Sequence, residues 1–142
     1  MMYKALSIAI CYVIFLLPFT AFSSPLTEDE ELRERCEKRS GEWFEKRHGS
    51  GCAMIKDVLI MSHYRNHYNK KMKKCFILTR TDYFSTNTGD ERFSNLSLCD
   101  VNENIHYGSV VITGSKADGK LLGRACASEQ EWVSFVTPYM DE

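Results

Sequence analysis

Residues 58–79 decide the fold, because their sequence, VLIMSHYRNHYNKKMKKCFILT, predicts two strands joined by a short polar turn. The first part, Val58 to Tyr68, is rich in β-branched and aromatic side chains and shows no apolar stripe at helical spacing. Asn69-Lys70-Lys71 is typical of a turn, and Cys75 to Thr79 is a short apolar run typical of a strand. Consecutive strands with short turns pair antiparallel, because a parallel pair needs a long crossover connection.

Two more strands are predicted further along the chain. Asn87-Thr88-Gly89-Asp90 indicates a turn, after which Leu96 to Val101 show strand-like alternation. Asn102-Glu103-Asn104 turns the chain again, and Ile105 to Thr113 supply a strand rich in Val and Ile. The centre of the chain therefore predicts a four-stranded antiparallel meander.

A helix is expected before these strands, from about residue 28 to 47. It begins at a capping box in which Thr27 is the N-cap and Glu30 the third residue of the helix. Its apolar side chains fall on one stripe that includes Cys36, so this cysteine is expected to face the core.

A second helix is expected after the strands, beginning at a capping box of Ser128 and Glu131. It carries an apolar stripe at helical spacing, and Pro138 is expected to kink or stop it near Thr137. The predicted fold is thus α+β, with an N-terminal helix, a four-stranded antiparallel meander and a C-terminal helix, both helices packing on the sheet.

The first 23 residues predict a secretory signal peptide. Lys4 supplies a short positive region, residues 5–22 are almost wholly apolar, and Ala21-Phe22-Ser23 offers small residues for a cleavage site. The alternative is an uncleaved membrane anchor, although Pro18 interrupts the apolar run near its end. We expect cleavage after Ser23, which leaves residues 24–142 as a single secreted or periplasmic α+β domain without a membrane span.

The composition narrows the range of functions. The chain has 142 residues, with 18 Lys and Arg against 19 Asp and Glu, and a formal net charge of −1. This length fits one domain, and the balanced charge argues against a nucleic-acid binder. The sequence contains no serine-hydrolase, zinc-protease or phosphate-loop motif. We therefore expect no catalytic residue, no metal and no cofactor.

Cysteine usage favours an oxidising compartment. Once the signal peptide with Cys11 is removed, an odd number of cysteines remains, so pairing leaves one thiol over. None of the cysteines forms a C-x-x-C pair, which argues against a zinc ribbon or a thioredoxin-like motif. We expect Cys36 to pair with a cysteine of the sheet, Cys75 being the first choice. The disulfide candidates are Cys36, Cys52, Cys75, Cys99 and Cys126.

The alternative function is a thiol- or metal-dependent envelope enzyme that uses Cys99 or the pair His63 and His67. On a strand, a spacing of four residues puts the two imidazoles about 13 Å apart, too far to share one ion. Residues 100–104, DVNEN, resemble half of a calcium loop, but the glycine and the glutamate that complete such a loop are missing.

The strongest local concentration of charge is a lysine cluster at the first hairpin: Lys70, Lys71, Lys73 and Lys74. Lysines at such a tip keep a hairpin soluble and prevent edge-to-edge pairing, which is the simpler interpretation. The functional interpretation is a contact surface for an anionic partner, either a protein or an envelope polymer.

Three motifs resemble those of a group of short secreted bacterial proteins of unknown function. The group is marked by an HYN-x4-KCF-like element, an L-x-D-V-x-E-like segment and a closing EW…PYM-x-E-like helix. The matching pieces here are residues 67–76, 98–103 and 131–142, although Cys99 departs from the second motif. The resemblance implies an exported single-domain protein and assigns no catalytic residue. We therefore expect a non-enzymatic binding or accessory module, such as an inhibitor or an immunity factor.

Overall fold

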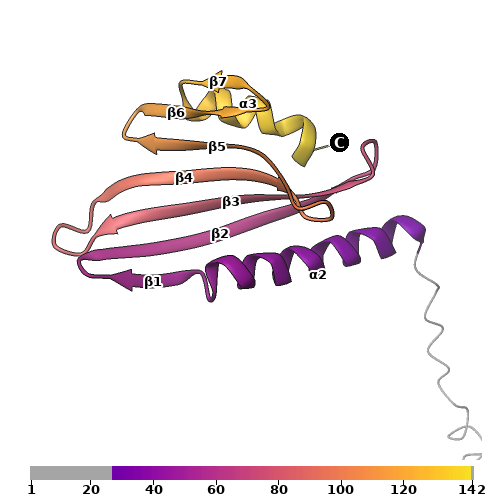
Figure 1. The fold of residues 1–142 in the computed structure, drawn as a ribbon, viewed down its shortest axis with the longest axis horizontal. Coiled ribbons are helices and arrows are strands. Elements are labelled where there is room, and N and C mark those ends of the chain that lie inside the picture. The colour runs from indigo at the N-terminus through magenta and orange to yellow at the C-terminus, as the bar shows by residue number, and fades with distance from the viewer. Residues whose placement is uncertain (1–26, 142) are drawn as a thin grey trace, which may run out of the picture.

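The computed structural model describes residues 27–141, and the expected signal peptide lies outside them. Seven strands form one antiparallel sheet in chain order, with α2 on one face and α3 on the other (Figure 1). The elements are α2 (Glu28–His48), β1 (Cys52–Ile55), β2 (Val58–Asn69), β3 (Lys74–Ser85), β4 (Glu91–Asp100), β5 (Ile105–Thr113), β6 (Lys116–Leu121), β7 (Arg124–Cys126) and α3 (Glu129–Met140).

The α+β class and the meander are as predicted, but the strand count of four was wrong. The three additional strands, β1, β6 and β7, are short and largely exposed, so they lack the apolar alternation that identifies a strand in sequence. Strand β6 also contains Gly119, which a sequence pattern assigns to a loop. In the sheet this glycine is required, because a Cβ there would lie 2.2 Å from the carbonyl oxygen of Ser109.

Helix α2 begins at the predicted capping box. The Thr27 hydroxyl accepts from the backbone N–H of Glu30 at 3.3 Å, and the Glu30 carboxylate accepts from the Thr27 N–H at 2.7 Å. The buried side chains Cys36, Ser40 and Phe44 are four residues apart, so they form one stripe along the helix. This stripe packs against β2, β3 and β4.

A disulfide joins α2 to the sheet. Cys36 and Cys75 are bonded, with 5.4 Å between their Cα atoms, as the sequence predicted. Both are almost fully buried, and Tyr68 packs beside them. The bond therefore anchors the middle of α2 to the start of β3.

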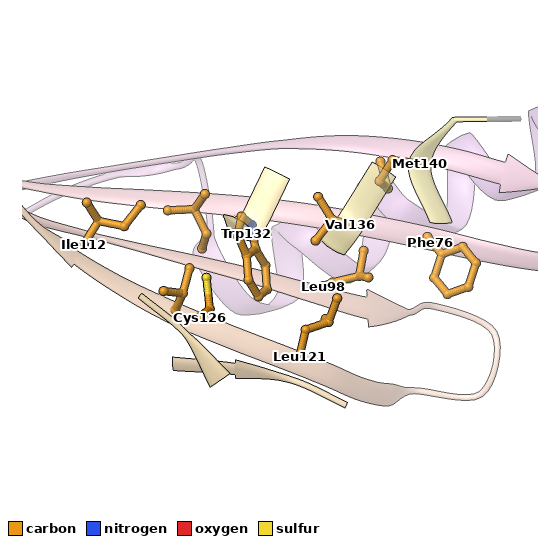
Figure 2. Close-up of a cluster of buried hydrophobic side chains, with 10 residues drawn as sticks. Phe76, Leu98, Ile112, Leu121, Cys126, Trp132, Val136 and Met140 are labelled. Carbon is orange, nitrogen blue, oxygen red and sulfur yellow. The ribbon is translucent and has the colours of Figure 1, made fainter. Parts of the chain in front are cut away.

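The larger core lies under α3 on the opposite face (Figure 2). Trp132, Val136 and Met140 project from α3 into an apolar layer supplied mainly by β3, β4 and β5. Their spacing of four residues is the apolar stripe expected from the sequence.

Pro138 does not end α3, contrary to the expectation of a kink or stop near Thr137, and the helix continues to Met140. Proline removes one N–H donor, and near the end of a helix that loss affects only the last turn. The buried side chain of Asn69 caps this end of the helix, because its Nδ2 donates to the carbonyl oxygens of Pro138 at 3.1 Å and Tyr139 at 3.4 Å, which have no N–H partner within the helix. Within residues 27–141, neither helix is long and apolar enough to cross a membrane.

Candidate functional site: a basic groove between α2 and the β4–β5 turn

The C-terminal half of α2 and the turn between β4 and β5 enclose a groove of about 460 Å³. We call it the basic groove. Its helix side consists of Arg39, Glu42, Trp43, Lys46 and Arg47, and its turn side consists of Val101, Asn102 and Asn104.

The helical repeat explains why these side chains share one side of α2. Arg39, Trp43 and Arg47 are four residues apart, so they form a row next to the buried stripe of Ser40 and Phe44. The row therefore faces the neighbouring β4–β5 turn. Cations near the end of a helix are also favoured by the helix dipole.

Hydrogen bonds from α2 to two asparagines hold the groove together. Arg39 Nη1 donates to Asn102 Oδ1 at 2.7 Å. Arg47 Nη2 and Trp43 Nε1 both donate to Asn104 Oδ1, at 2.8 and 3.3 Å. The guanidinium of Arg47 also lies over the Trp43 ring, 3.9 Å from its centroid. The two arginines are thus held in place before any ligand arrives.

The positive charge of the groove is not neutralised. Asparagine amides satisfy donors but carry no charge, and within residues 27–141 no carboxylate lies at ion-pair distance from Arg39, Lys46 or Arg47. Glu42 is the acidic side chain that lines the groove. Fixed guanidinium groups with free charge are well suited to bind carboxylate or phosphate oxygens.

The predicted lysine cluster is divided by the fold. Lys74 Nζ binds the fully buried Asp100 carboxylate at 2.9 Å and Glu103 at 2.5 Å, and these bonds raise the pKa of Lys74. Lys70 forms an ion pair with Asp29 at 2.5 Å. Lys71 and Lys73 are exposed at the hairpin tip. Lys74 therefore has a structural role, which no local sequence pattern indicates because Asp100 is 26 residues away.

The other three cysteines within residues 27–141 stay as thiols, contrary to the expectation that only one would be left. Cys52 is exposed, whereas Cys99 and Cys126 are buried. Burial raises the pKa of the Cys99 thiol, so the nucleophilic thiolate is disfavoured. His106 is the cross-strand partner of Cys99, but its own side chain is exposed.

The two histidines of the alternative hypothesis lie on β2. The strand repeat puts His63 and His67 on one face, about 13 Å apart by strand geometry. Within residues 27–141, no group of three or more His, Cys, Asp or Glu side chains is arranged to hold a metal ion. Among the described residues, the structure therefore does not place further metal-ligating side chains beside His63 and His67.

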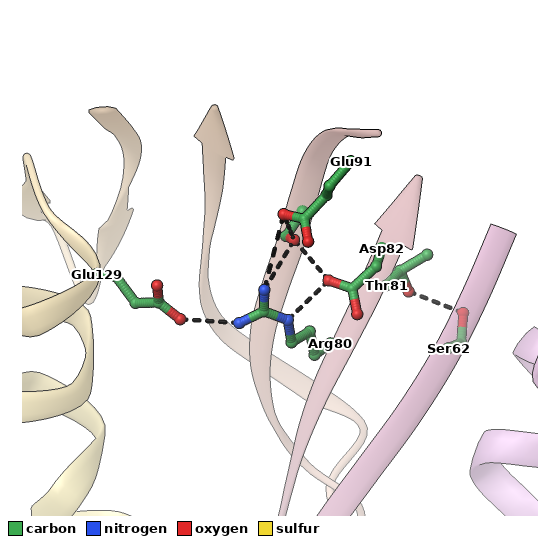
Figure 3. Close-up of polar contacts among 7 residues, drawn as sticks. Ser62, Arg80, Thr81, Asp82, Glu91 and Glu129 are labelled. Carbon is green, nitrogen blue, oxygen red and sulfur yellow. Dashed lines mark hydrogen bonds and ion pairs between the residues drawn. The ribbon is translucent and has the colours of Figure 1, made fainter. Parts of the chain in front are cut away.

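A second polar cluster, which sequence reasoning missed, lies at the start of α3 (Figure 3). Arg80 donates to Asp82 at 2.7 Å and to Glu129 at 2.8 Å, and Glu91 lies 3.8 Å away. Glu129 is the first residue of α3, and Asp82 is buried in β3. Because carboxylates surround Arg80, this cluster fixes α3 on the sheet and leaves no free positive charge for a ligand.

No protein-family model, no curated protein and no solved structure matches the chain.

Proposed function

We propose that this protein is a small exported binding module, without enzymatic activity, that recognises an acidic segment of another protein in the basic groove. The observation that carries the proposal is the pair Arg39 and Arg47, which are held by asparagines and Trp43 and keep their charge. Charged side chains that are fixed in advance lose little conformational entropy when a ligand binds.

The spacing of the two arginines favours an extended peptide. They are eight residues apart on α2, which corresponds to about 12 Å along the helix axis. Carboxylates four residues apart on an extended chain are separated by about 13 Å. An acidic segment with that spacing can place one carboxylate on each guanidinium, while Lys46 adds further positive potential.

Other observations support an exported binding module over the enzyme alternative. The Cys36–Cys75 disulfide is typical of an oxidising compartment, in keeping with the predicted signal peptide. The raised pKa of Cys99 opposes its use as a nucleophile. The resemblance to short secreted bacterial proteins points in the same direction.

A titration with synthetic acidic peptides tests the proposal. The probe is a flexible Gly/Ser peptide with glutamates at every fourth position, and binding is followed through Trp43 fluorescence or by calorimetry. Arg39→Glu/Arg47→Glu is expected to weaken binding at least tenfold, because each lost charged hydrogen bond contributes about 1.5–3 kcal/mol. Lys71→Glu/Lys73→Glu is the matched control, since it makes the same change in net charge at exposed positions of the β2–β3 hairpin tip, outside the groove.

A second variant tests whether the groove must be held in place. Asn104 has a positive φ of 54°, so Asn104→Gly removes the amide without straining the backbone. We expect this variant to bind the peptide several-fold more weakly while keeping its thermal stability within a few degrees. Equal weakening in the Lys71/Lys73 control would contradict the proposal, and so would preferential binding of an acidic polysaccharide such as polygalacturonate.

A further inference from the structure

Strand β1 is an edge of the sheet. It pairs only with β2, and in Figure 1 it continues the line of α2 along the outer side of the sheet. All four of its residues are exposed, including Met54 at 66% and Ile55 at 59%. Edge strands are usually kept from pairing by being very short or by a lysine, a proline or a covering element; β1 is short, but its sequence Cys-Ala-Met-Ile has no lysine or proline.

The hydrogen bonds with β2 show which backbone groups of β1 point outward. Ser62 N donates to Gly51 O at 2.6 Å, so Gly51 belongs to a hydrogen-bonded pair of the ladder. In an antiparallel ladder such pairs alternate, and Ala53 and Ile55 therefore also direct their backbone groups towards β2. The N–H and C=O groups of Cys52 and Met54 then point away from the sheet.

We propose that a second copy of this chain pairs antiparallel with β1, about a twofold axis at Ala53. In this register Cys52 lies opposite Met54 of the second copy, and four backbone hydrogen bonds satisfy the outward groups of both strands. The contact is isologous, so it closes as a dimer and does not extend into a filament. This inference is independent of the proposed peptide binding.

The side chains fit this register by size. Ile55 lies opposite Gly51 of the second copy, which has no side chain, and the two Ala53 methyl groups meet on the axis. On the other face, the register places Met61 and Cys52 of one copy beside Met54 and Leu59 of the other. Met54 and Met61, which are 66% and 47% exposed, thereby become part of one apolar row. This match favours a second copy over an unrelated strand.

Cysteine cross-linking tests the register directly. In Cys52→Ser/Ala53→Cys, the new thiols occupy a non-hydrogen-bonded pair with about 4.5 Å between Cα atoms, within the range of a disulfide. The oxidant is glutathione disulfide, so two protein thiols and one glutathione disulfide give one protein disulfide and two reduced glutathiones. We expect rapid formation of a covalent dimer.

Cys52→Ser/Ile55→Cys is the matched control. The thiols at position 55 of the two copies would lie four residues apart along the paired β1 strands, a distance of about 13 Å. They are therefore not expected to cross-link. The inference is overturned if Ala53→Cys cross-links no faster than Ile55→Cys, or if both give only mixed disulfides with glutathione.

Sedimentation equilibrium on the unmodified protein gives a second readout. The average mass should rise towards that of a dimer between 1 and about 200 μM, as expected for a small, weak interface. Met54→Pro removes an N–H that points away from the sheet and makes no hydrogen bond to β2. This variant should therefore need a higher protein concentration for the same increase in average mass. A mass equal to that of one chain throughout this range would contradict the inference.

Discussion

Removing the Cys36–Cys75 disulfide is the perturbation whose effect on stability follows most directly from the structure. The bond joins residues 39 positions apart, and both cysteines are buried. Closing a loop of about 40 residues restricts the unfolded chain and is expected to stabilise the fold by about 4 kcal/mol at 25 °C. For a domain of this size, losing that amount lowers the thermal midpoint by about 15 °C.

Two ways of breaking the bond separate the cross-link from the packing. Reduction with dithiothreitol removes only the cross-link, whereas Cys36→Ala/Cys75→Ala also removes two buried sulfur atoms and should cost somewhat more. Thermal unfolding followed by circular dichroism measures both. Cys52→Ser is the matched control, because Cys52 is an exposed free thiol and its replacement should change stability by less than about 0.5 kcal/mol.

Two results would refute this reasoning. One is a loss of less than about 1 kcal/mol on reduction, which would mean that the unfolded chain gains little freedom when the loop opens. The other is an equal loss in Cys52→Ser, which would mean that the effect is not specific to the cross-link. Because the bond anchors α2, the reduced protein should also bind the acidic peptide more weakly.

Three further predictions concern single side chains. Lys74→Gln should lower the thermal midpoint far more than Lys71→Gln, because it leaves the buried carboxylate of Asp100 without its cation; equal effects would contradict the structural role. Iodoacetamide should alkylate the exposed Cys52 quickly and Cys99, whose pKa is raised by burial, only after unfolding, as mass spectrometry of the peptides can show. Burial and the neighbouring Arg47 lower the pKa of His48, so the unfolded chain takes up its proton first as the pH falls and stability decreases below the ordinary histidine pKa of about 6.5. His48→Gln should reduce this loss between pH 7 and 5, and an unchanged pH profile would exclude His48 as the cause.

Several features of the fold were predictable because their causes lie close together in the sequence. Capping side chains act on backbone groups two or three residues away, so Thr27 and Ser128 marked the helix starts. Only Thr27 forms the full predicted capping box, because Glu131 accepts from the N–H of Ala127 and not from that of Ser128. The apolar stripe that contains Cys36 follows from the 3.6-residue repeat, and the apolar run at Cys75 marked its strand. The disulfide choice succeeded because both partners were recognisably buried.

The short strands depended on contacts that no local pattern contains. Residues 116–121 have the composition of a loop, and they form β6 because Gly119 lets the chain approach Val110 closely. Strand β1 is equally hard to recognise, since none of its side chains is buried. For such segments the sheet as a whole supplies the hydrogen bonds, and the segment's own side chains contribute little.

The basic groove shows the same division between local and long-range causes. Sequence alone determined that cations occur on α2 and at the first hairpin. Which of these charges are neutralised by a carboxylate was decided by residues far along the chain, because Arg39 and Arg47 meet asparagines 63 and 57 positions away while Lys74 meets the buried Asp100. Whether a charged side chain is available to a ligand depends on its partners within the protein. Those partners are set by strand register and helix packing in the tertiary structure.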